Sequence, residues 1–351
     1  MLAVFLLGVA IWAFGALLGA PVRLRLGLLA GLWLVVVLIN LTLPEDASLR
    51  LATGGDVRPW LVLALAAGAI WAYRQGLSVL RRRAQPTEPA EPTEPATKAP
   101  LFSEAELNRY ARHMMLREVG GPGQKRLKEA KVLVIGAGGL GSPALLYLAA
   151  AGVGTIGVID DDTVEGSNLQ RQIIHADDRI GMPKVHSAAQ QMQAINPFIT
   201  VNPYHRRLSP EDAEVLFADY DLILDGTDNF DTRYLTNQTA VKLGKPLIAA
   251  AITQWEGQIS LYDPAQGGPC FACVFPERPA EGLVPSCAEA GVIAPLPGVL
   301  GSMMALEAIK ALTGAGETLR GALLIYDGLY GETRRISVKR HAGCPVCGNG
   351  G

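Results

Sequence analysis

The sequence predicts an α/β protein with a doubly wound, mostly parallel β-sheet. Three observations predict it: a strand leads into a glycine-rich turn and an apolar helix, the next strand ends in an acid, and strand and helix patterns then alternate as far as Tyr262. Alternating strands and helices favour parallel strands joined by crossover helices, and such sheets bind ligands at the carboxyl ends of their strands. The expected architecture is therefore Rossmann-like, with a site beside the glycine-rich turn.

The glycine-rich turn follows a β-branched run at residues 131–135 and precedes an apolar, alanine-rich segment at residues 140–151, which is typical of a buried helix. Glycines allow backbone N–H groups to approach a phosphate at a helix N-terminus, where unpaired donors favour negative charge. The next strand, at residues 155–159, ends at Asp160, where an acid can meet a ribose hydroxyl. The pattern predicts a nucleotide site built on four glycines: Gly136, Gly138, Gly139 and Gly141.

Strand and helix patterns continue beyond this acid. Helical patterns cover residues 186–196, 210–217 and 232–243, and strand patterns cover residues 200–204, 221–224, 246–251 and 258–262. The strand at 221–224 runs into Asp225-Gly-Thr-Asp228-Asn229, so Asp228 and Asp160 both lie at strand ends and can face one nucleotide. A carboxylate there suits Mg²⁺, with Asp228 as the expected ligand. Asp225 is the alternative, in which case Asp228 forms the turn.

The front of the chain carries an excess of apolar residues. The mean hydropathy of the whole chain is +0.23, and the net charge of −2 gives no reason to expect a nucleic-acid partner. Residues 2–20 and 26–43 are uncharged and long enough to cross a bilayer as helices, and residues 60–80 are a third candidate if Arg74 reaches the interface. No positive region precedes the first run, so residues 1–83 are predicted to be a retained anchor of two or three spans.

The arginines predict on which side of the membrane the rest of the chain lies. Six flank the predicted inner ends and two lie in the predicted outer loop, which predicts that the bulk of the chain lies in the cytoplasm. A topology with two spans and the N-terminus inside would leave the rest of the chain on the same side of the membrane. The inner arginines are Arg23, Arg25, Arg74, Arg81, Arg82 and Arg83, and the outer ones are Arg50 and Arg58.

A linker separates the anchor from the predicted domain, and the first helix of that domain begins soon after the linker. Residues 84–100 repeat Pro-Thr-Glu-Pro-Ala without a large apolar residue, which predicts a semi-extended tether. The domain then covers residues 101–351. Ser103 with Glu106 indicates a capping box at the start of a helix that carries Arg112.

Three features separate an ATP site from a dinucleotide site. Arg171 and Lys184 follow Asp160, and two cations suit a triphosphate, because they neutralise charge that shifts during nucleotidyl transfer. Asp228 supplies the metal-binding carboxylate. Two Cys-x-x-Cys pairs give four thiolates, the number that closes a structural zinc tetrahedron, whereas disulfides are less expected on the reducing side of a membrane. The pairs are Cys270 with Cys273 and Cys344 with Cys347.

Taken together, these motifs resemble the MoeB/ThiF/HesA family of E1-like adenylyltransferases, and the MoeB branch most. The resemblance extends from about residue 107 to 348 and includes RYARHMMLRE, VLVIGAGGLGS, DDDTVEGSNLQRQ, GMPKV, DGTDN, the cysteine pairs and PSCAEAGVIAPLPGVLGS. It implies ATP-dependent adenylation of the C-terminal Gly-Gly of a ubiquitin-like sulfur carrier, MoaD- or ThiS-like, for molybdopterin, thiamine or another thio-cofactor, with ATP, Mg²⁺ and Zn²⁺ as cofactors. No rhodanese-like sulfurtransferase domain follows Cys347, so a separate sulfur donor is expected.

The resemblance also implies roles for individual residues. Arg171 and Lys184 would face the phosphates, and Arg112 would enter the partner subunit's site, which implies a homodimer. Cys287 is either a catalytic thiol or a buried bystander. The family's ATP contacts fall on Gly139, Asp160, Ser167, Asn168, Arg171, Lys184, Asp228 and Asn229, and the other three glycines, Leu169 and Gln170 complete the predicted nucleotide-binding set.

Two other classes of function remain open on the sequence alone. A nicotinamide-dependent oxidoreductase would share the glycine turn and Asp160 but would not need Lys184. A non-catalytic membrane scaffold would keep the fold but would not need Arg171, Lys184 and Asp228, all of which are present.

Overall fold

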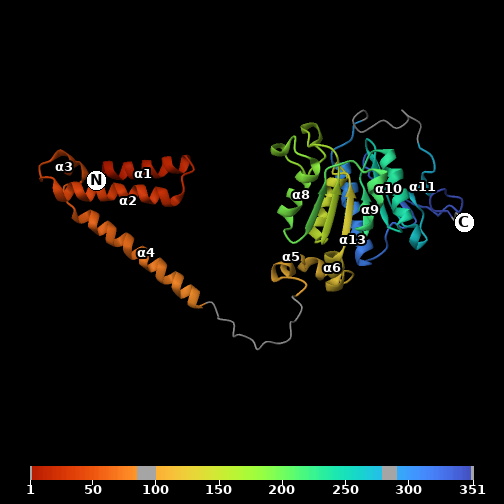
Figure 1. Ribbon diagram of the computed structural model, residues 1–351, viewed down its shortest axis with the longest axis horizontal. Helices are drawn as coiled ribbons and strands as arrows, with labels where there is room; N and C mark the ends of the chain where they lie inside the picture. The colour runs from red at the N-terminus through yellow and green to blue at the C-terminus, as the bar shows by residue number, and fades with distance from the viewer. Residues whose placement is uncertain (1, 85–99, 279–290, 349–351) are drawn as a thin grey trace. The chain divides into compact units, whose positions relative to one another are not determined.

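The computed structural model describes residues 2–84, 100–278 and 291–348, and the chain divides into two compact units, Met1–Lys98 and Ala99–Gly351 (Figure 1). The division falls within the proline-rich segment at residues 84–100.

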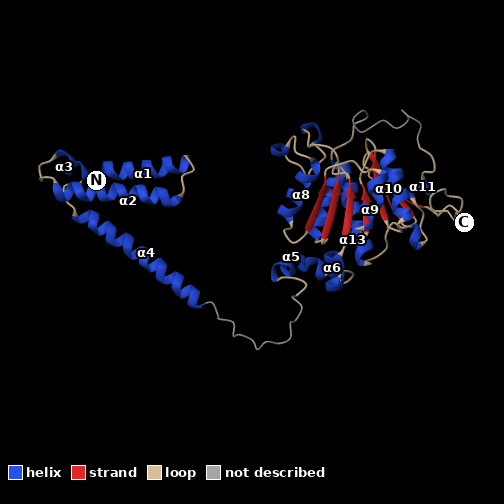
Figure 2. Ribbon diagram, in the orientation of Figure 1, coloured by secondary structure: helices blue, strands red, loops and turns tan. Residues whose placement is uncertain are grey.

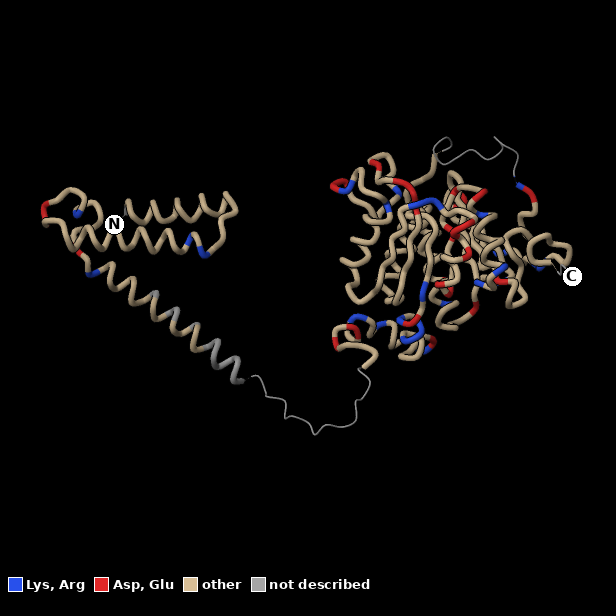
Figure 3. Tube along the Cα trace, in the orientation of Figure 1, with Lys and Arg blue, Asp and Glu red and all other residues tan. Residues whose placement is uncertain are grey.

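The first unit is helical, and α1 packs against α2 as an antiparallel hairpin (Figure 1). Apart from the first turn of α2, the lengths of both helices carry no charged residue (Figure 3). The helices of this unit are α1 (Leu2–Leu17), α2 (Val22–Thr42), α3 (Ser48–Thr53) and α4 (Arg58–Ala84).

Helix α2 begins at Val22, ahead of the uncharged run at residues 26–43, so Arg23 and Arg25 lie in its first turn. The long side chain of Arg25 makes this arrangement favourable. Its Nε donates to the carbonyl oxygen of Ala20 at 2.8 Å, and its guanidinium carbon lies 5.2 Å from the ring centroid of Trp12.

Polar side chains join α2, α3 and α4. Asn40 is buried, and its Nδ2 donates to the carbonyl oxygen of Val36 and to Oγ1 of Thr53, both at 2.9 Å. The indole Nε1 of Trp60 donates to the carbonyl oxygen of Thr53 at 3.1 Å, and that of Trp33 donates to the carbonyl oxygen of Trp60 at 2.9 Å. Buried polar groups of this kind are stable only when paired, so these bonds fix α3 against its neighbours.

Among the described residues, two helices have the length and composition to cross a membrane: α2, with 11% of its apolar window buried, and α13 (Pro295–Thr313), with 50% buried. Helix α13 belongs to the core of the second unit, which explains its apolar sequence. Length and composition alone do not distinguish a membrane span from a core helix or a signal sequence.

The second unit is built on one eight-stranded sheet in the order β3-β2-β1-β4-β5-β6-β7-β8, with helices on both faces (Figure 2). Strands β1 to β5 run parallel, as the alternating pattern predicted, whereas β6, β7 and β8 pair in antiparallel fashion. The strands are β1 (Lys131–Ile135), β2 (Thr155–Ile159), β3 (Thr200–Tyr204), β4 (Leu222–Asp225), β5 (Leu247–Ile252), β6 (Glu256–Tyr262), β7 (Ala322–Asp327) and β8 (Glu332–Ser337).

Alternating side chains of the central strands supply two separate cores. Val132 and Val134 of β1 pack with α7, α8 and α13 on one face, while Leu133 and Ile135 pack with α9 and α10 on the other. The predicted capping box is confirmed where Oγ of Ser103 accepts from the Glu106 amide. The helices are α5 (Glu104–Met114), α6 (Gly120–Glu129), α7 (Gly141–Ala151), α8 (Lys184–Ile195), α9 (Pro210–Ala218), α10 (Phe230–Lys242) and α11 (Phe271–Val274), with short 3₁₀ turns η1 (Gly166–Asn168), η2 (Asp177–Arg179) and η3 (Pro264–Gln266).

Helix α13 packs against α7 and supports the glycine-rich turn from the C-terminal half of the chain. A Cβ atom on Gly139 would lie 3.1 Å from Cβ of Pro297, and one on Gly301 would lie 2.2 Å from the carbonyl oxygen of Leu140. These short distances leave no room for a side chain at Gly139 or Gly301, so the glycine turn packs directly against α13.

Candidate nucleotide-binding site

A cavity of about 820 Å³ lies at the carboxyl ends of the parallel strands. This is where ligands bind open α/β sheets, and the volume is in the range of small-molecule sites. The cavity brings together eight of the residues predicted from sequence: Gly136, Gly138, Gly139, Asp160, Arg171, Lys184, Asp228 and Asn229.

The glycine-rich turn passes tightly from β1 into α7. Gly136 has a φ of +93°, a conformation that favours glycine. A Cβ atom on Gly141 would lie only 1.9 Å from the carbonyl oxygen of Gly136, so no side chain fits there. Gly141 begins α7 and supports the turn without lining the cavity. The backbone donors of this helix start are therefore placed beside the cavity.

Asp160 is fixed by two backbone amides at the end of β2. Its Oδ2 accepts a hydrogen bond from the Ala137 amide at 2.7 Å, and its Oδ1 accepts one from the Asp162 amide at 2.8 Å. Burial raises the pKa of the Asp160 carboxyl, and the two amides oppose this shift. The carboxyl group thus has one orientation, and lone pairs remain for a hydroxyl donor.

The two predicted cations enter the cavity from different elements. Nη2 of Arg171 donates to Oδ1 of Asn168 at 2.8 Å, which holds the guanidinium beside the glycine turn. Lys184 is the first residue of α8 and is 4% exposed. Its Nζ lies 2.7 Å from Oδ2 of Asp162, whose side chain is 65% exposed. A buried ammonium group with one solvated counterion can exchange that partner for a phosphate.

The turn after β4 separates the roles of the two neighbouring acids. Asp225 is buried, and its Oδ1 accepts from the amide and hydroxyl of Thr227 at 2.9 and 2.7 Å. Asn229 caps α10, because its Oδ1 accepts from the Thr232 amide at 3.1 Å. Asp228 lies between them, is exposed and lines the cavity. Asp225 therefore forms the turn, which leaves Asp228 for a ligand.

Several predicted residues do not line the cavity. Ser167, Asn168, Leu169 and Gln170 lie on or just after η1, and Asn168 acts on the cavity through Arg171. Arg112 lies exposed on α5 and is not among the residues that line the cavity of its own chain. Cys287 lies outside the described residues.

Two buried side chains in the cavity wall were not singled out from sequence. Gln172 is 5% exposed, and its Oε1 has no hydrogen-bond partner in the described part of the chain. Arg233 is also 5% exposed and donates to the carbonyl oxygens of Thr227 and Ala250, so it holds the Asp228 turn against β5. Arg233 lies inside a helical pattern, and nothing in its sequence position indicates a place in the site. Gln172 directly follows Arg171, and this position beside a predicted site residue is a signal that could have identified it.

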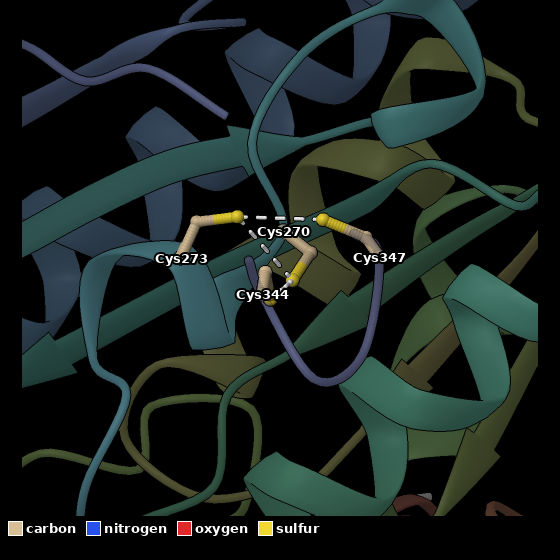
Figure 4. A group of neighbouring side chains, drawn as sticks. All are labelled: Cys270, Cys273, Cys344 and Cys347. Carbon is tan, nitrogen blue, oxygen red and sulfur yellow. Dashed lines mark hydrogen bonds between the residues drawn. The ribbon is translucent and has the colours of Figure 1, made fainter. Parts of the chain in front are cut away.

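The four paired cysteines converge at one point although the pairs are far apart in sequence (Figure 4). Their Sγ atoms lie within 4.8 Å of one another. Neighbouring sulfurs are 3.3 Å apart for Cys273 and Cys347 and 3.6 Å apart for Cys270 and Cys344. A zinc tetrahedron with Zn–S bonds of about 2.3 Å spaces its sulfurs about 3.8 Å apart. The donor set and its geometry fit Zn²⁺.

The surroundings of the sulfurs also fit a metal site. The amide of His341 donates to Sγ of Cys273 at 3.4 Å, and Nδ2 of Asn237 lies 3.8 Å from Sγ of Cys270. Such donors stabilise thiolate ligands. Burial raises the pKa of the Cys270 thiol, so its thiolate needs a nearby cation.

The fold and the cavity define a doubly wound α/β domain whose cavity lies beside a glycine-rich helix N-terminus, as in nucleotide-binding domains. The ThiF family matches residues 110–346, and the chain belongs to this family. The expected resemblance to MoeB/ThiF-type E1-like adenylyltransferases is thereby confirmed.

Several curated relatives are similar to this chain over about 250 residues. The sulfur carrier protein adenylyltransferase of Thermus thermophilus is 50% identical over 252 residues, which are 71% of this chain and 93% of the relative. The probable adenylyltransferase/sulfurtransferase MoeZ of Mycobacterium tuberculosis is 51% identical over 250 residues, but this chain covers only 64% of it. The SAMP-activating enzyme E1 of Haloferax volcanii is 46% identical over 246 residues, which are 70% of this chain and 90% of the relative.

Among solved structures, a crystal structure of E. coli MccB with ATP is 25% identical, with a TM-score of 0.61 over 69% of this chain and 75% of MccB. The fold of this chain is therefore similar to that of a protein crystallised with ATP.

Proposed function

We propose that this protein is a nucleotidyltransferase that adenylates the C-terminal glycine of a small sulfur-carrier protein with ATP. The observation that carries the proposal is the cavity in which Asp160, Arg171, Lys184 and Asp228 meet beside the glycine turn. Curated relatives that are about half identical and bear the names of adenylyltransferases support this reaction.

The charges in the cavity suit an attack by one anion on another. The carboxylate of the carrier attacks the α-phosphorus of ATP, the bond from that phosphorus to the bridging oxygen breaks, and pyrophosphate leaves. Arg171 and Lys184 lower the barrier by neutralising the charge that accumulates on the phosphates. Asp160 orients the ribose, which holds the α-phosphate in line with the attacking group. The step needs no protein nucleophile, so Cys287 has no required part in it.

Two metals have candidate ligands in this chain. Asp228 would hold Mg²⁺, which neutralises triphosphate charge when it is bound. Cys270, Cys273, Cys344 and Cys347 would hold a structural Zn²⁺, which would join α11 and the residue before it to the segment after β8.

The partners proposed are a carrier with a C-terminal Gly-Gly, a second copy of this chain that receives Arg112, and a separate sulfur donor. The name of the Haloferax volcanii relative, a SAMP-activating enzyme, supports a small protein as the substrate. The product would be a carrier acyl-adenylate, for molybdopterin, thiamine or another thio-cofactor.

We also propose that residues 1–83 anchor the enzyme in the inner membrane with the catalytic domain in the cytoplasm. Helix α2 supports this, because it is apolar, 21 residues long and little buried within its unit. Ala47→Cys lies in the predicted outer loop. In intact cells a membrane-impermeant maleimide should label A47C and leave the parent chain unlabelled. An unlabelled A47C chain, or a labelled parent chain, would contradict this topology.

ATP–pyrophosphate exchange tests the catalytic proposal. The purified full chain is incubated with ATP, Mg²⁺, labelled pyrophosphate and either a MoaD- or a ThiS-like carrier. Exchange should require a carrier that ends in Gly-Gly and should disappear when the last glycine is deleted. Exchange with neither carrier would contradict the proposal, and tight binding of NAD without binding of ATP would favour an oxidoreductase.

A further inference from the structure

His175 lies between two parts of the nucleotide site, although it does not line the cavity itself. The ring is 7% exposed. Its Nε2 lies 2.9 Å from the carbonyl oxygen of Ala137 in the glycine turn, and its Nδ1 lies 2.9 Å from Oγ of Ser187 in α8. Both ring nitrogens are therefore paired, one on each side.

The partners of the ring determine its tautomer. A carbonyl oxygen can only accept, so Nε2 carries the proton and donates to Ala137, and Nδ1 accepts from the hydroxyl of Ser187. Burial lowers the pKa of His175 to about 4, and the nearby cations Lys184 and Arg179 act in the same direction. The ring is thus neutral at physiological pH.

The backbone of Ala137 is held at both its carbonyl and its amide group. Its carbonyl accepts from His175, and its amide donates to Oδ2 of Asp160 at 2.7 Å. The carbonyl belongs to the peptide unit shared with Gly138 and the amide to the unit shared with Gly136, and these two planar units meet at the Cα atom of Ala137. Holding one group in each unit restricts rotation about the φ and ψ angles of Ala137, and so restricts the direction of the N–H group that orients the Asp160 carboxyl. On the other side of the ring, Ser187 lies one turn after Lys184 in the same helix.

We propose that His175 is a positioning residue that sets the glycine turn with Asp160 against the helix that carries Lys184, and so prepares the site for ATP. The inference rests on the proposed function, because it assigns ATP to this cavity. Without the ring, the Ala137 carbonyl loses its donor, the turn can rotate, and the ribose and phosphate contacts no longer meet one ligand. The loss of one buried hydrogen bond corresponds to roughly a tenfold change in affinity.

Three variants of the full chain test this inference. His175→Phe removes both hydrogen bonds, and His175→Gln keeps an amide donor that can reach the Ala137 carbonyl. Ser187→Ala removes only the hydrogen bond at Nδ1. The dissociation constant for ATP is measured by calorimetry well below the unfolding temperature, and the KM values for ATP and for the carrier are measured by pyrophosphate exchange.

We expect H175F to raise the ATP dissociation constant and the KM for ATP about tenfold and to leave the KM for the carrier unchanged. H175Q should restore ATP affinity to within about twofold of the parent chain, and S187A should weaken it about threefold. A merely structural role would lower the melting temperature and the active fraction, but it would not raise the KM for ATP alone.

Several results would overturn the inference. If H175F binds ATP as tightly as the parent chain, the His175 ring has no role in ATP binding. The same conclusion follows if H175Q binds ATP as weakly as H175F. If H175F does not fold, S187A with the parent affinity would overturn the inference in its place. A parent chain that binds no ATP would overturn the proposed function together with the inference, whereas unchanged variants of an ATP-binding parent would overturn the inference alone.

Discussion

Replacement of Lys184 by methionine should separate activity from stability. The ammonium group is almost fully buried, and its partner Asp162 lies 2.7 Å away with a side chain that is 65% exposed. Methionine fills similar space without a charge, and Asp162 can turn fully into water. The substitution therefore leaves no buried unpaired carboxylate, and the free energy of unfolding should change by less than about 1 kcal/mol.

The effect on catalysis should be much larger. If Lys184 stabilises charge on the transferring phosphates, its loss removes about 3–4 kcal/mol of transition-state stabilisation, which is a fall in kcat of about 10²–10³-fold. Pyrophosphate exchange gives kcat, and thermal or urea unfolding gives stability. A matched control is Lys242→Met, because Lys242 pairs with Glu214 at 2.5 Å on the surface and does not line the cavity. K242M should retain full activity.

Two outcomes would refute this reasoning. A fall in kcat of less than about threefold would show that the ammonium group does not face the reacting phosphates. A loss of several kcal/mol in stability would show that Lys184 supports the fold, and the lost activity would then follow from unfolding.

Three further predictions concern other parts of the site. Cys344→Ser should lose bound zinc, as measured by metal analysis, and should lower the free energy of unfolding by roughly 3 kcal/mol or more, as measured by denaturant unfolding. Unchanged zinc content would contradict the metal assignment. If Arg112 acts in the partner's site, a mixture of inactive R112A and K184M chains that exchange subunits should recover about a quarter of the parent activity. Half of the dimers in such a mixture contain one chain of each kind, and each of these mixed dimers has one complete site out of two. No recovery would place Arg112 in the site of its own chain. Because the folded pKa of His175 is about 4 against an ordinary 6.5, the unfolded chain binds more protons in this window, and stability should fall by up to about 3 kcal/mol as the pH drops from 6.5 to 4. Urea unfolding across this range should show this component in the parent chain, and its persistence in H175Q would contradict its assignment to the ring.

Much of the parallel half of the sheet could be predicted because each strand is a short apolar run bounded by polar turns. Residues 155–159 and 200–204 were predicted with the observed bounds, and the helix expected at 186–196 begins two residues earlier, at Lys184. Strand β8 shows why the antiparallel edge gave less signal. All of its residues are exposed, so its sequence, ETRRIS, lacks the alternation of apolar and polar residues that marks a half-buried strand.

The glycines of the turn, Asp160 and Asp228 shared a sequence signal, since they come just after strand ends. The residues that hold them do not. His175, Ser187 and Arg233 act through partners that only the folded chain brings near, and a histidine within IIHADD has no spacing that indicates which carbonyl it contacts. The sequence favoured Asp228 over Asp225 as the metal ligand, and the burial of Asp225 and its hydrogen bonds with Thr227 support the same choice.

The packing of α13 behind the glycine turn has a consequence for synthesis of the protein. Pro297 follows Gly139 by 158 residues (297 minus 139), and its side chain closes the turn from behind. At about 5–20 residues per second, a ribosome needs roughly 8–30 s to add the intervening chain. During this interval α13 has not been synthesised, and the apolar face of α7 that packs against it is uncovered. Its exposure to chaperones and to aggregation during synthesis therefore depends on translation speed.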